Sequence, residues 1–149
     1  MQLSPSAHVD TFCRDHLPAP ELWPELRFDL PDVQYPDRLN CAVELLDSVV
    51  AEHGADRPCL LSPDGPVWTY ADLLRVSNQV ARVLTTEYGV VPGNRVLLRG
   101  PNTPWLAACW FGVLLAGGVA VTTMALLRPR ELEVIGEIAE LSSLVGAAG

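Results

Sequence analysis

Two arginines, Arg128 and Arg130, follow an apolar run that ends at Met124. Open parallel sheets bind ligands at the carboxyl ends of their strands, so the segments after Ser62, Arg99 and Met124 are the places to look for functional groups. A guanidinium in such a loop can hold a phosphate through two parallel hydrogen bonds. The positions therefore predict a phosphate-binding pair at Arg128 and Arg130, and ordinary surface charge is the alternative.

Several kinds of catalysis are excluded by composition. All ten basic residues are arginine, so the chain contains no lysine for Schiff-base chemistry or phosphoryl transfer. The GxGxxG and GxSxG patterns of dinucleotide sites and hydrolases are absent. Gly112 and Gly118 have the spacing of a phosphate loop, but they lie in an apolar helix pattern without the required lysine, which favours close helix packing instead. We predict no catalytic residue within this chain.

A metal site is also not expected. His8, Cys13 and His16 could act as ligands, but they lie in a proline-rich stretch without a fourth ligand at a recognised spacing. Four glutamates near the carboxyl end alternate with apolar residues and predict the solvated side of a helix: Glu131, Glu133, Glu137 and Glu140.

Charge and cysteine usage restrict the partners and the compartment. Ten basic and eighteen acidic residues give a formal net charge of -8, the wrong sign for attracting nucleic acid or an anionic membrane surface. The four cysteines show no CxxC pair, and the first ten residues lack the pattern of a signal peptide. We therefore expect a reduced, cytoplasmic protein that binds neither nucleic acid nor membranes.

The first 39 residues predict an irregular arm. Six of the thirteen prolines lie within the first 36 residues, and each removes a backbone donor and fixes φ. Large apolar residues such as Phe12, Trp23 and Tyr35 make this stretch too apolar for a solvated linker. We expect it to lie as a strap over a neighbouring surface.

Residues 40–149 alternate between strand and helix patterns and predict a partial α/β subdomain. Asn40 and Gly54 delimit one helix, and Thr69 with Asp72 forms a variant capping box for another that continues to Gly89. The apolar period predicts that the first helix has one face formed by Ala42, Leu45, Leu46, Val49 and His53, and the second by Leu73, Val76, Val80, Val83 and Leu84. Strands are expected at 58–62, 67–69, 94–99, 119–124 and 144–145, and helices at 41–53, 70–88, from 104 and from 129. This order predicts an incomplete, mostly parallel sheet with helices on both sides, and a hairpin at 58–69.

A membrane protein is the alternative for one segment. The uncharged stretch from Gly100 to Leu127 is long enough for a span, which needs about 20 residues. Gly117 and Gly118 interrupt it, and the composition changes there to β-branched residues. A buried helix followed by a buried strand explains both halves.

Several segments resemble the adenylate-forming superfamily of acyl-CoA synthetases. Trp68–Leu73 is similar to its early Thr-Tyr-x-Glu-Leu motif, and Leu114–Val119 to its helix-to-strand junction, with Leu115 where the family has lysine. Pro92–Val96, continuing through Gly100–Asn102, resembles the strand and loop that follow the first motif. In the arm, three segments resemble the start of 2-aminobenzoate and benzoate CoA ligases: His8–Phe12, Glu21–Pro24 and Tyr35–Ala42.

The resemblance implies an ATP-dependent, two-step reaction in a longer enzyme. A carboxylate attacks ATP to give an acyl-adenylate, and the thiol of CoA then displaces AMP to form a thioester. The family's phosphate-binding loop, acidic ribose-binding residue and catalytic lysine have no counterpart here. We therefore expect that ATP, magnesium, CoA and an aromatic carboxylate bind only in the complete enzyme and that this segment alone binds none of them. Arg128 and Arg130 lie near the loop where relatives contact CoA phosphates.

The resemblance also predicts how this segment interacts. In the family the sheet and helices pack against the following segment, so an isolated segment leaves an apolar surface and a sheet edge uncovered. The expected partners are the remainder of the ligase chain or a second copy. The alternative is a self-sufficient α/β binding or interaction module without catalytic activity.

Overall fold

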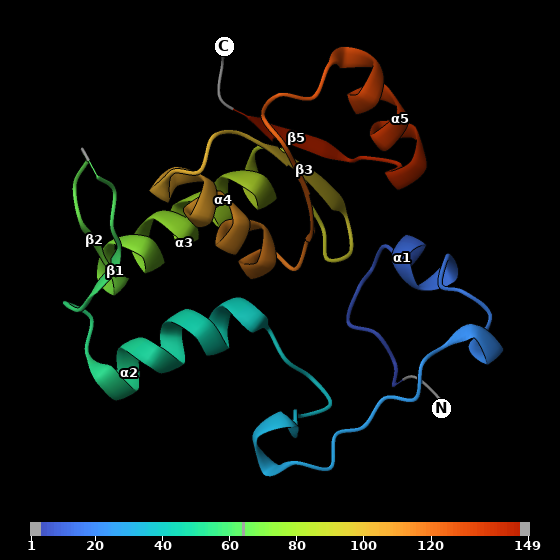
Figure 1. The fold of residues 1–149 in the computed structure, drawn as a ribbon, viewed down its shortest axis with the longest axis horizontal. Coiled ribbons are helices and arrows are strands. Elements are labelled where there is room, and N and C mark those ends of the chain that lie inside the picture. Colours follow the sequence, from blue (N-terminus) through green and yellow to red (C-terminus); the bar gives the residue numbers. More distant parts are fainter. Residues whose placement is uncertain (1–3, 64, 147–149) are drawn as a thin grey trace.

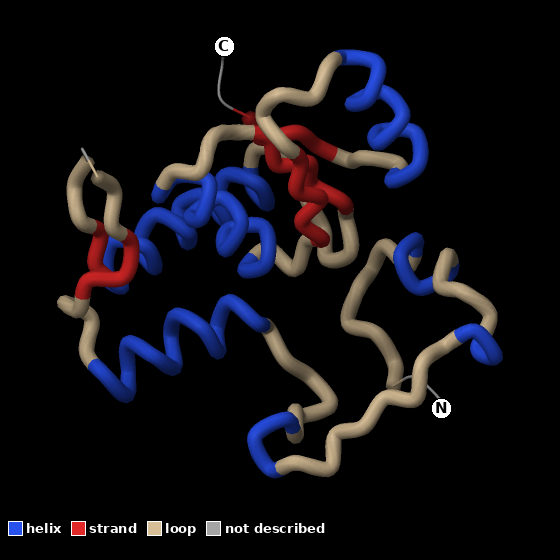
Figure 2. The backbone as a smooth tube through the Cα atoms, viewed as in Figure 1, coloured by secondary structure: helices blue, strands red, loops and turns tan. Residues whose placement is uncertain are grey.

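The computed structural model describes residues 4–63 and 65–146, which form an α/β body preceded by an extended arm (Figure 1). The body contains a three-stranded parallel sheet of order β4-β3-β5, with β3 at Arg95–Arg99, β4 at Val119–Thr123 and β5 at Ser143–Gly146. Figure 2 shows these strands side by side with helices around them. The predicted incomplete parallel sheet with flanking helices is confirmed.

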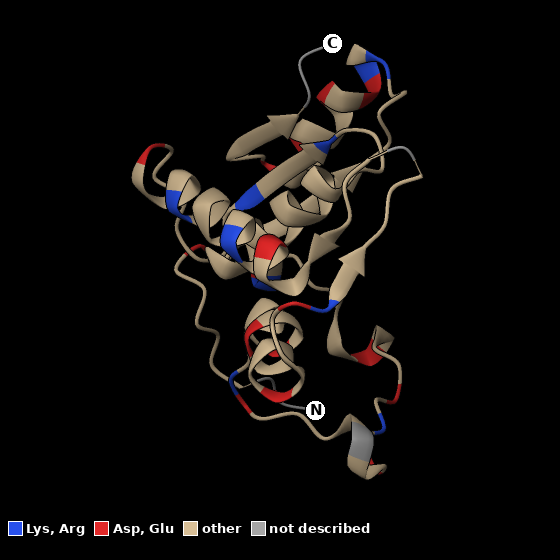
Figure 3. Ribbon diagram, turned by 90° about the vertical axis from the view of Figure 1, so that its left-hand side faces the viewer, with Lys and Arg blue, Asp and Glu red and all other residues tan. Residues whose placement is uncertain are grey.

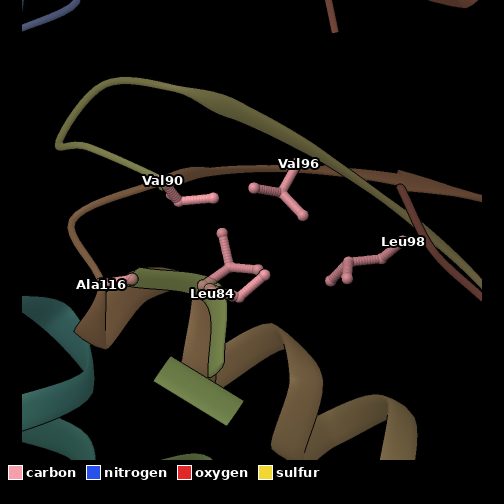
Figure 4. Packing of buried hydrophobic residues seen from close by; sticks show 6 residues of the cluster. Leu84, Val90, Val96, Leu98 and Ala116 are labelled. Atoms are coloured by element: carbon pink, nitrogen blue, oxygen red, sulfur yellow. The ribbon is translucent and has the colours of Figure 1, made fainter. Parts of the chain in front are cut away.

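Helices cover both faces of this sheet. Val96 and Leu98 of β3 point toward α3 (Tyr70–Thr86) and α4 (Pro104–Leu115) and form a buried cluster with Leu84, Val90 and Ala116 (Figure 4). The alternate residues of β3 face the opposite side, where α5 (Pro129–Ala139) lies. The two crossovers thus place α4 and α5 on opposite faces, as right-handed connections require for strands on either side of β3.

The helix α3 begins with the predicted capping box. The backbone amide of Asp72 donates to the Thr69 hydroxyl at 3.2 Å, and the backbone amide of Thr69 donates to the Asp72 carboxylate at 3.2 Å. The Thr69 hydroxyl in turn donates to the Asp72 carboxylate at 3.0 Å. The hydrogen bonds that this carboxylate accepts from the backbone and hydroxyl of Thr69 lower the pKa of Asp72. The face of α3 predicted to be buried is confirmed at Leu73, Val76 and Leu84, whereas Val83 is exposed.

Gly112 sets the distance between α3 and α4. A Cβ atom at this position would lie 2.6 Å from Val80 Cγ1 and 3.0 Å from the Ser77 carbonyl oxygen. Such distances are too short for any side chain without movement of α3. The interpretation of Gly112 as a helix-packing residue is confirmed.

The predicted hairpin exists, but it is separate from the parallel sheet. β1 (Pro58–Leu60) and β2 (Trp68–Thr69) pair antiparallel as a two-stranded sheet of their own. The hairpin packs on the start of α4 through an edge-to-face contact of Trp68 with Trp105, at 5.4 Å between ring centroids. The segment after Ser62 is therefore the hairpin turn, and its expected place at the carboxyl edge of the main sheet is wrong.

The helix predicted at 41–53 is present with a different periodicity. Residues Val43–Ser48 are wound as a π-helix that continues into α2 (Val49–His53). Asn40 caps it as expected by accepting from the amide of Ala42 at 3.0 Å. Because a π-helix has more residues per turn, Ala42 and Leu46 share the buried side while Leu45 is half exposed. The prediction that Leu45 faces the core is wrong.

Within residues 4–39, the arm contains only short helical segments, as its prolines predict. These are α1 (Phe12–Asp15) and two 3₁₀ turns at Pro20–Leu22 and Pro31–Val33. Close to the start of the described chain, the amides of Val9 and Asp10 donate to the Pro92 carbonyl at 2.9 and 3.0 Å. At the carboxyl end of the arm, the side-chain amide of Asn40 donates to the Leu114 carbonyl of α4 at 2.9 Å. Between these ends most large apolar side chains are exposed, so the strap touches the body mainly at its two ends.

Arg95 connects the arm to the sheet and to α5. Its side chain is only 6% exposed and forms an ion pair with Asp10. The guanidinium also donates to the carbonyls of Ala139 at 2.8 Å and Glu140 at 2.7 Å, and it lies 4.3 Å from the ring centre of Phe12. A buried charge needs such partners, because its desolvation would otherwise strongly destabilise the fold.

The stretch considered as a membrane span is divided between two elements. The helix α4 ends at Leu115, and after the turn at Gly117, whose φ is 74°, the chain continues as β4. Across residues 4–63 and 65–146, every helix falls short of the length and apolarity that a bilayer crossing requires.

The close contact at Gly112 gives a prediction about stability. Replacing glycine by alanine inside a helix normally stabilises it by about 1 kcal/mol. At Gly112 the overpacking against α3 should exceed this gain, since inserted methyl groups cost about 1–3 kcal/mol. We expect Gly112→Ala to lower the urea midpoint of unfolding. Gly136→Ala in α5 is the matched control, because its Cβ would lie 3.6 Å from Leu141 Cδ1, and it should leave the midpoint unchanged or raised. A stabilised Gly112→Ala variant would contradict this packing.

The anchor of the arm gives a pH-dependent prediction. Hydrogen bonds from the Phe12 amide, Arg95 and Asn94 lower the pKa of Asp10 below its ordinary value of 3.8. Folding therefore favours the ionised carboxylate, whose stabilisation is complete above that value and is lost as the pH falls through the lowered folded pKa.

We expect Asp10→Asn to reduce stability at neutral pH and to make residues 13–39 more sensitive to limited proteolysis. The stability difference from the original chain should shrink in strong acid, and urea unfolding at several pH values measures it. Asp56→Asn, at an exposed carboxylate, is the control. A difference that stays constant from pH 7 to pH 2 would show that the ion pair has no part in it.

Candidate phosphate-binding edge of the sheet

The carboxyl edge of the parallel sheet is the candidate site. Arg99, the last residue of β3, is in register with Thr123 of β4 on one side and with Gly146 of β5 on the other. The three strands therefore end at one edge. The segment 124–128 leaves the sheet there and leads into α5, so the sequence correctly places the loop of Arg128 and Arg130 at this edge.

Arg99 holds this loop in place. Its Nη2 atom donates to the Ala125 carbonyl at 2.7 Å and to the Leu127 carbonyl at 3.4 Å. Its Nε atom is buried and has no hydrogen-bond partner in the structure. One nitrogen of the guanidinium, Nη2, thus donates to the backbone of the loop that precedes Arg128. Sequence reasoning treated Arg99 only as the end of a strand, although an arginine closing an apolar strand is a signal that a polar partner lies nearby.

Arg128 and Arg130 lie at the start of α5 with exposed side chains. Within the described ranges neither guanidinium forms an ion pair. The Glu131 carboxylate accepts from the Arg128 backbone amide, so this helix end already has an anionic partner. Figure 3 shows basic and acidic residues next to each other at this end of the molecule. The phosphate-binding role of the two arginines stays a prediction.

The described residues at this edge include few of the groups that phosphoryl chemistry uses. Phosphoryl chemistry requires cations and metal ligands aimed at the phosphates. The chain has no lysine, and the nearest buried guanidinium, that of Arg99, is bound to backbone carbonyls. In the part of the chain that the structure describes, no three histidine, cysteine or acidic side chains come together as a metal site.

His16 and the four glutamates near the carboxyl end have structural or solvent-exposed positions. His16 Nδ1 lies 2.9 Å from the Phe12 carbonyl oxygen. The centroids of the His16 and Phe12 rings are 4.1 Å apart. The described side chains of Glu131, Glu133, Glu137 and Glu140 are all exposed, as expected for the solvated side of α5. Glu140 ends that helix in the left-handed conformation with φ of 43°, and its carbonyl is one of the Arg95 partners.

Two cysteines are unsuited to act as nucleophiles. Burial raises the pKa of Cys59 and of Cys109, so both thiols are protonated at neutral pH.

A wide hollow of about 1150 Å³ lies between the arm and the body and is lined mainly by arm residues, including His8 and Arg38. It is open to solvent, and none of its lining groups forms a catalytic arrangement.

Comparison with known proteins identifies the family of this fold. The AMP-binding enzyme family matches residues 46–148, which is more than half of the chain and includes the whole parallel sheet. The chain belongs to the AMP-binding enzyme family. The match begins after the arm, so the family assignment does not depend on the sequence of the arm.

Several relatives share this part of the AMP-binding fold. A long-chain-fatty-acid–CoA ligase of Haemophilus influenzae is 37% identical over 91 residues, which are 61% of this chain and 16% of that protein. The crystal structure of the anthranilate CoA ligase AuaEII in complex with anthranoyl-AMP matches with a TM-score of 0.64 and 28% identity, over 70% of this chain and 20% of that one. A benzoate CoA ligase from Burkholderia xenovorans matches with a TM-score of 0.66 and 27% identity, over 73% and 22%. This AMP-binding chain thus spans about a fifth of the length of its relatives.

The position of Arg128 and Arg130 gives a prediction for an enzyme that contains these residues. If the two guanidinium groups bind CoA phosphates, replacing both by alanine should raise the Michaelis constant for CoA with little change in kcat, because contacts made equally in the bound and transition states would be lost. Steady-state kinetics with varied CoA measures this. Arg82→Ala, at an exposed arginine of α3, is the control. An unchanged Michaelis constant would reject the assignment.

Proposed function

We propose that residues 1–149 form the amino-terminal part of an ATP-dependent ligase that joins an aromatic carboxylate to CoA. The complete enzyme would first form an acyl-adenylate and pyrophosphate, and the CoA thiol would then displace AMP to give the thioester. The observation that carries the proposal is the β4-β3-β5 sheet with its flanking helices, which has the fold of the AMP-binding family and is similar to two aromatic-acid CoA ligases over 70% and 73% of the chain.

The choice of an aromatic acid rests on two further points. The arm segments His8–Phe12, Glu21–Pro24 and Tyr35–Ala42 resemble the start of 2-aminobenzoate and benzoate CoA ligases, and they lie before the residues that the family matches. Both solved structures quoted above are of ligases named for benzoate or anthranilate. A long-chain-fatty-acid–CoA ligase is also similar to this chain, over 61% of its length, so membership of the family does not by itself set the substrate class.

Within such an enzyme these residues would act as a scaffold. Their carboxyl edge presents Arg128 and Arg130 toward solvent, and the loop that holds them is fixed by Arg99. The charges needed to activate ATP must come from elsewhere, since the chain has no lysine. The four cysteines are free, which supports the proposed cytoplasmic location.

Pyrophosphate release tests both parts of this proposal. The purified 149-residue chain with ATP, magnesium and 2-aminobenzoate should release no more pyrophosphate than a sample without protein. A complete enzyme that contains these residues should release it with 2-aminobenzoate or benzoate and then form the CoA thioester.

A long-chain fatty acid is the comparison substrate in the same assay. A complete enzyme that prefers the fatty acid would overturn the aromatic assignment while leaving the family unchanged. Turnover by the 149-residue chain alone would overturn its role as a scaffold.

A further inference from the structure

The arm docks on the amino edge of the parallel sheet through one short segment, residues 9–12. Two amides of this segment donate to the Pro92 carbonyl, at 2.9 and 3.0 Å. The Asn94 side chain donates to the Asp10 carboxylate at 2.9 Å. A Cβ atom at Gly93 would overlap the carbonyl oxygen of Asp10, so the backbone of the arm lies directly on this turn. Docking is therefore a defined fit between two backbone segments.

The helix α5 depends mainly on contacts at its ends. None of its residues, Pro129–Ala139, is buried, and Ile138 is 73% exposed. At its carboxyl end the Arg95 guanidinium donates to the carbonyls of Ala139 and Glu140. Glu140 has a φ of 43°, a conformation that a residue other than glycine keeps only when its surroundings support it. The end of α5 thus relies on the Arg95 guanidinium.

Arg95 serves the arm and α5 with a single charge. Among the described residues, Asp10 is the carboxylate that pairs with it, whereas the carbonyls at the end of α5 are neutral acceptors. A guanidinium that loses its counter-ion is more stable in water than in a buried position. Release of Asp10 therefore favours an Arg95 side chain that turns toward solvent and leaves the carbonyls of Ala139 and Glu140.

We propose that docking of the arm and packing of α5 are coupled through Arg95, so that each stabilises the other. In the closed state, which the structure shows, Arg95 holds Asp10 and the end of α5 together. In the open state residues 9–12 leave Pro92, Arg95 reaches solvent, and the last turn of α5 loses its donors. Such a coupling is reciprocal, so a change at Glu140 acts on the arm just as a change at Asp10 acts on α5.

The coupling extends to the candidate phosphate-binding edge. Arg128 precedes α5 and Arg130 lies in its first turn, and Arg99 holds the loop before this helix. In the open state α5 stays attached to the sheet through that loop alone. An effect on CoA binding would rest on the proposed function, whereas the coupling itself does not and is tested without substrate.

Hydrogen–deuterium exchange of the 149-residue chain tests the effect of the arm on α5. In Asp10→Asn the amides of residues 137–142 should exchange about tenfold faster relative to those of α4, because loss of a charge-assisted hydrogen bond favours local opening by roughly that factor. Asp15→Asn is the matched control, since Asp15 is an exposed aspartate of the same arm that accepts from the Thr11 hydroxyl at 2.6 Å. It should leave the exchange of α5 unchanged. An equal acceleration in α4 and α5 would indicate general destabilisation and overturns the coupling.

Two substitutions at Glu140 test the reverse direction. Glycine adopts a φ of 43° readily, whereas a β-branched valine is strained there. Glu140→Gly and Glu140→Val remove the same exposed charge, so a difference between them reports chiefly the backbone conformation. The amides of residues 9–12 should exchange roughly three times more slowly in Glu140→Gly than in Glu140→Val, relative to those of α4. Equal exchange in the two variants overturns the proposal.

A further variant tests whether Arg95 carries the coupling. In Arg95→Gln, which has no charge to neutralise, adding Asp10→Asn should no longer accelerate the exchange of residues 137–142. A full effect of Asp10→Asn in that background overturns the role of Arg95. If circular dichroism shows that Arg95→Gln unfolds the chain, the comparison of Asp10→Asn with Asp15→Asn and that of the two Glu140 variants decide.

Discussion

The buried guanidinium of Arg95 is the constraint on which this arrangement depends. It occupies the first position of the central strand, where a positive charge is removed from water and must be matched by acceptors. The carboxylate of Asp10 comes from the arm, and the carbonyls of Ala139 and Glu140 come from the end of α5. One side chain thereby fixes three separate segments at the amino edge of the sheet.

At the opposite edge of the sheet, a second arginine of β3 also holds a neighbouring segment in place. Arg99 closes the same strand and binds the backbone of the segment before α5. The two arginines of β3 thus hold α5 from both ends, one at its last carbonyls and one through the loop before its first turn. This fixed helix displays Arg128 and Arg130 at the edge where parallel sheets bind ligands. The fold therefore supplies a fixed helix whose start carries two exposed arginines.

The sequence predicts the elements of the body well because their signals are local. The capping box at Thr69, the proline after Thr103 and the paired glycines before Val119 each mark a boundary that the structure contains. The loop of Arg128 follows from strand order alone. The π-helical turn at residues 43–48 was not predicted, because its extra residue per turn leaves no signature in the apolar pattern.

Contacts between distant segments could not be read from the pattern. Asp10 and Arg95 are 85 positions apart, and nothing in their neighbourhoods marks them as partners. The hairpin at Pro58–Thr69 has the pattern of any short strand pair, so its separation from the main sheet depends on packing against Trp105. The same limit applies to Arg99, whose acceptors are backbone carbonyls that any sequence provides.

The position of β3 at the centre of the sheet also fixes an order of events during synthesis. Both of its neighbours come later in the chain, since Val96 pairs with Ala120 on one side and with Ser143 on the other. This apolar strand is therefore synthesised before either of the strands that pair with it. During synthesis β3 therefore stays without a sheet partner until β4 has been added, and its other side stays open until β5 follows.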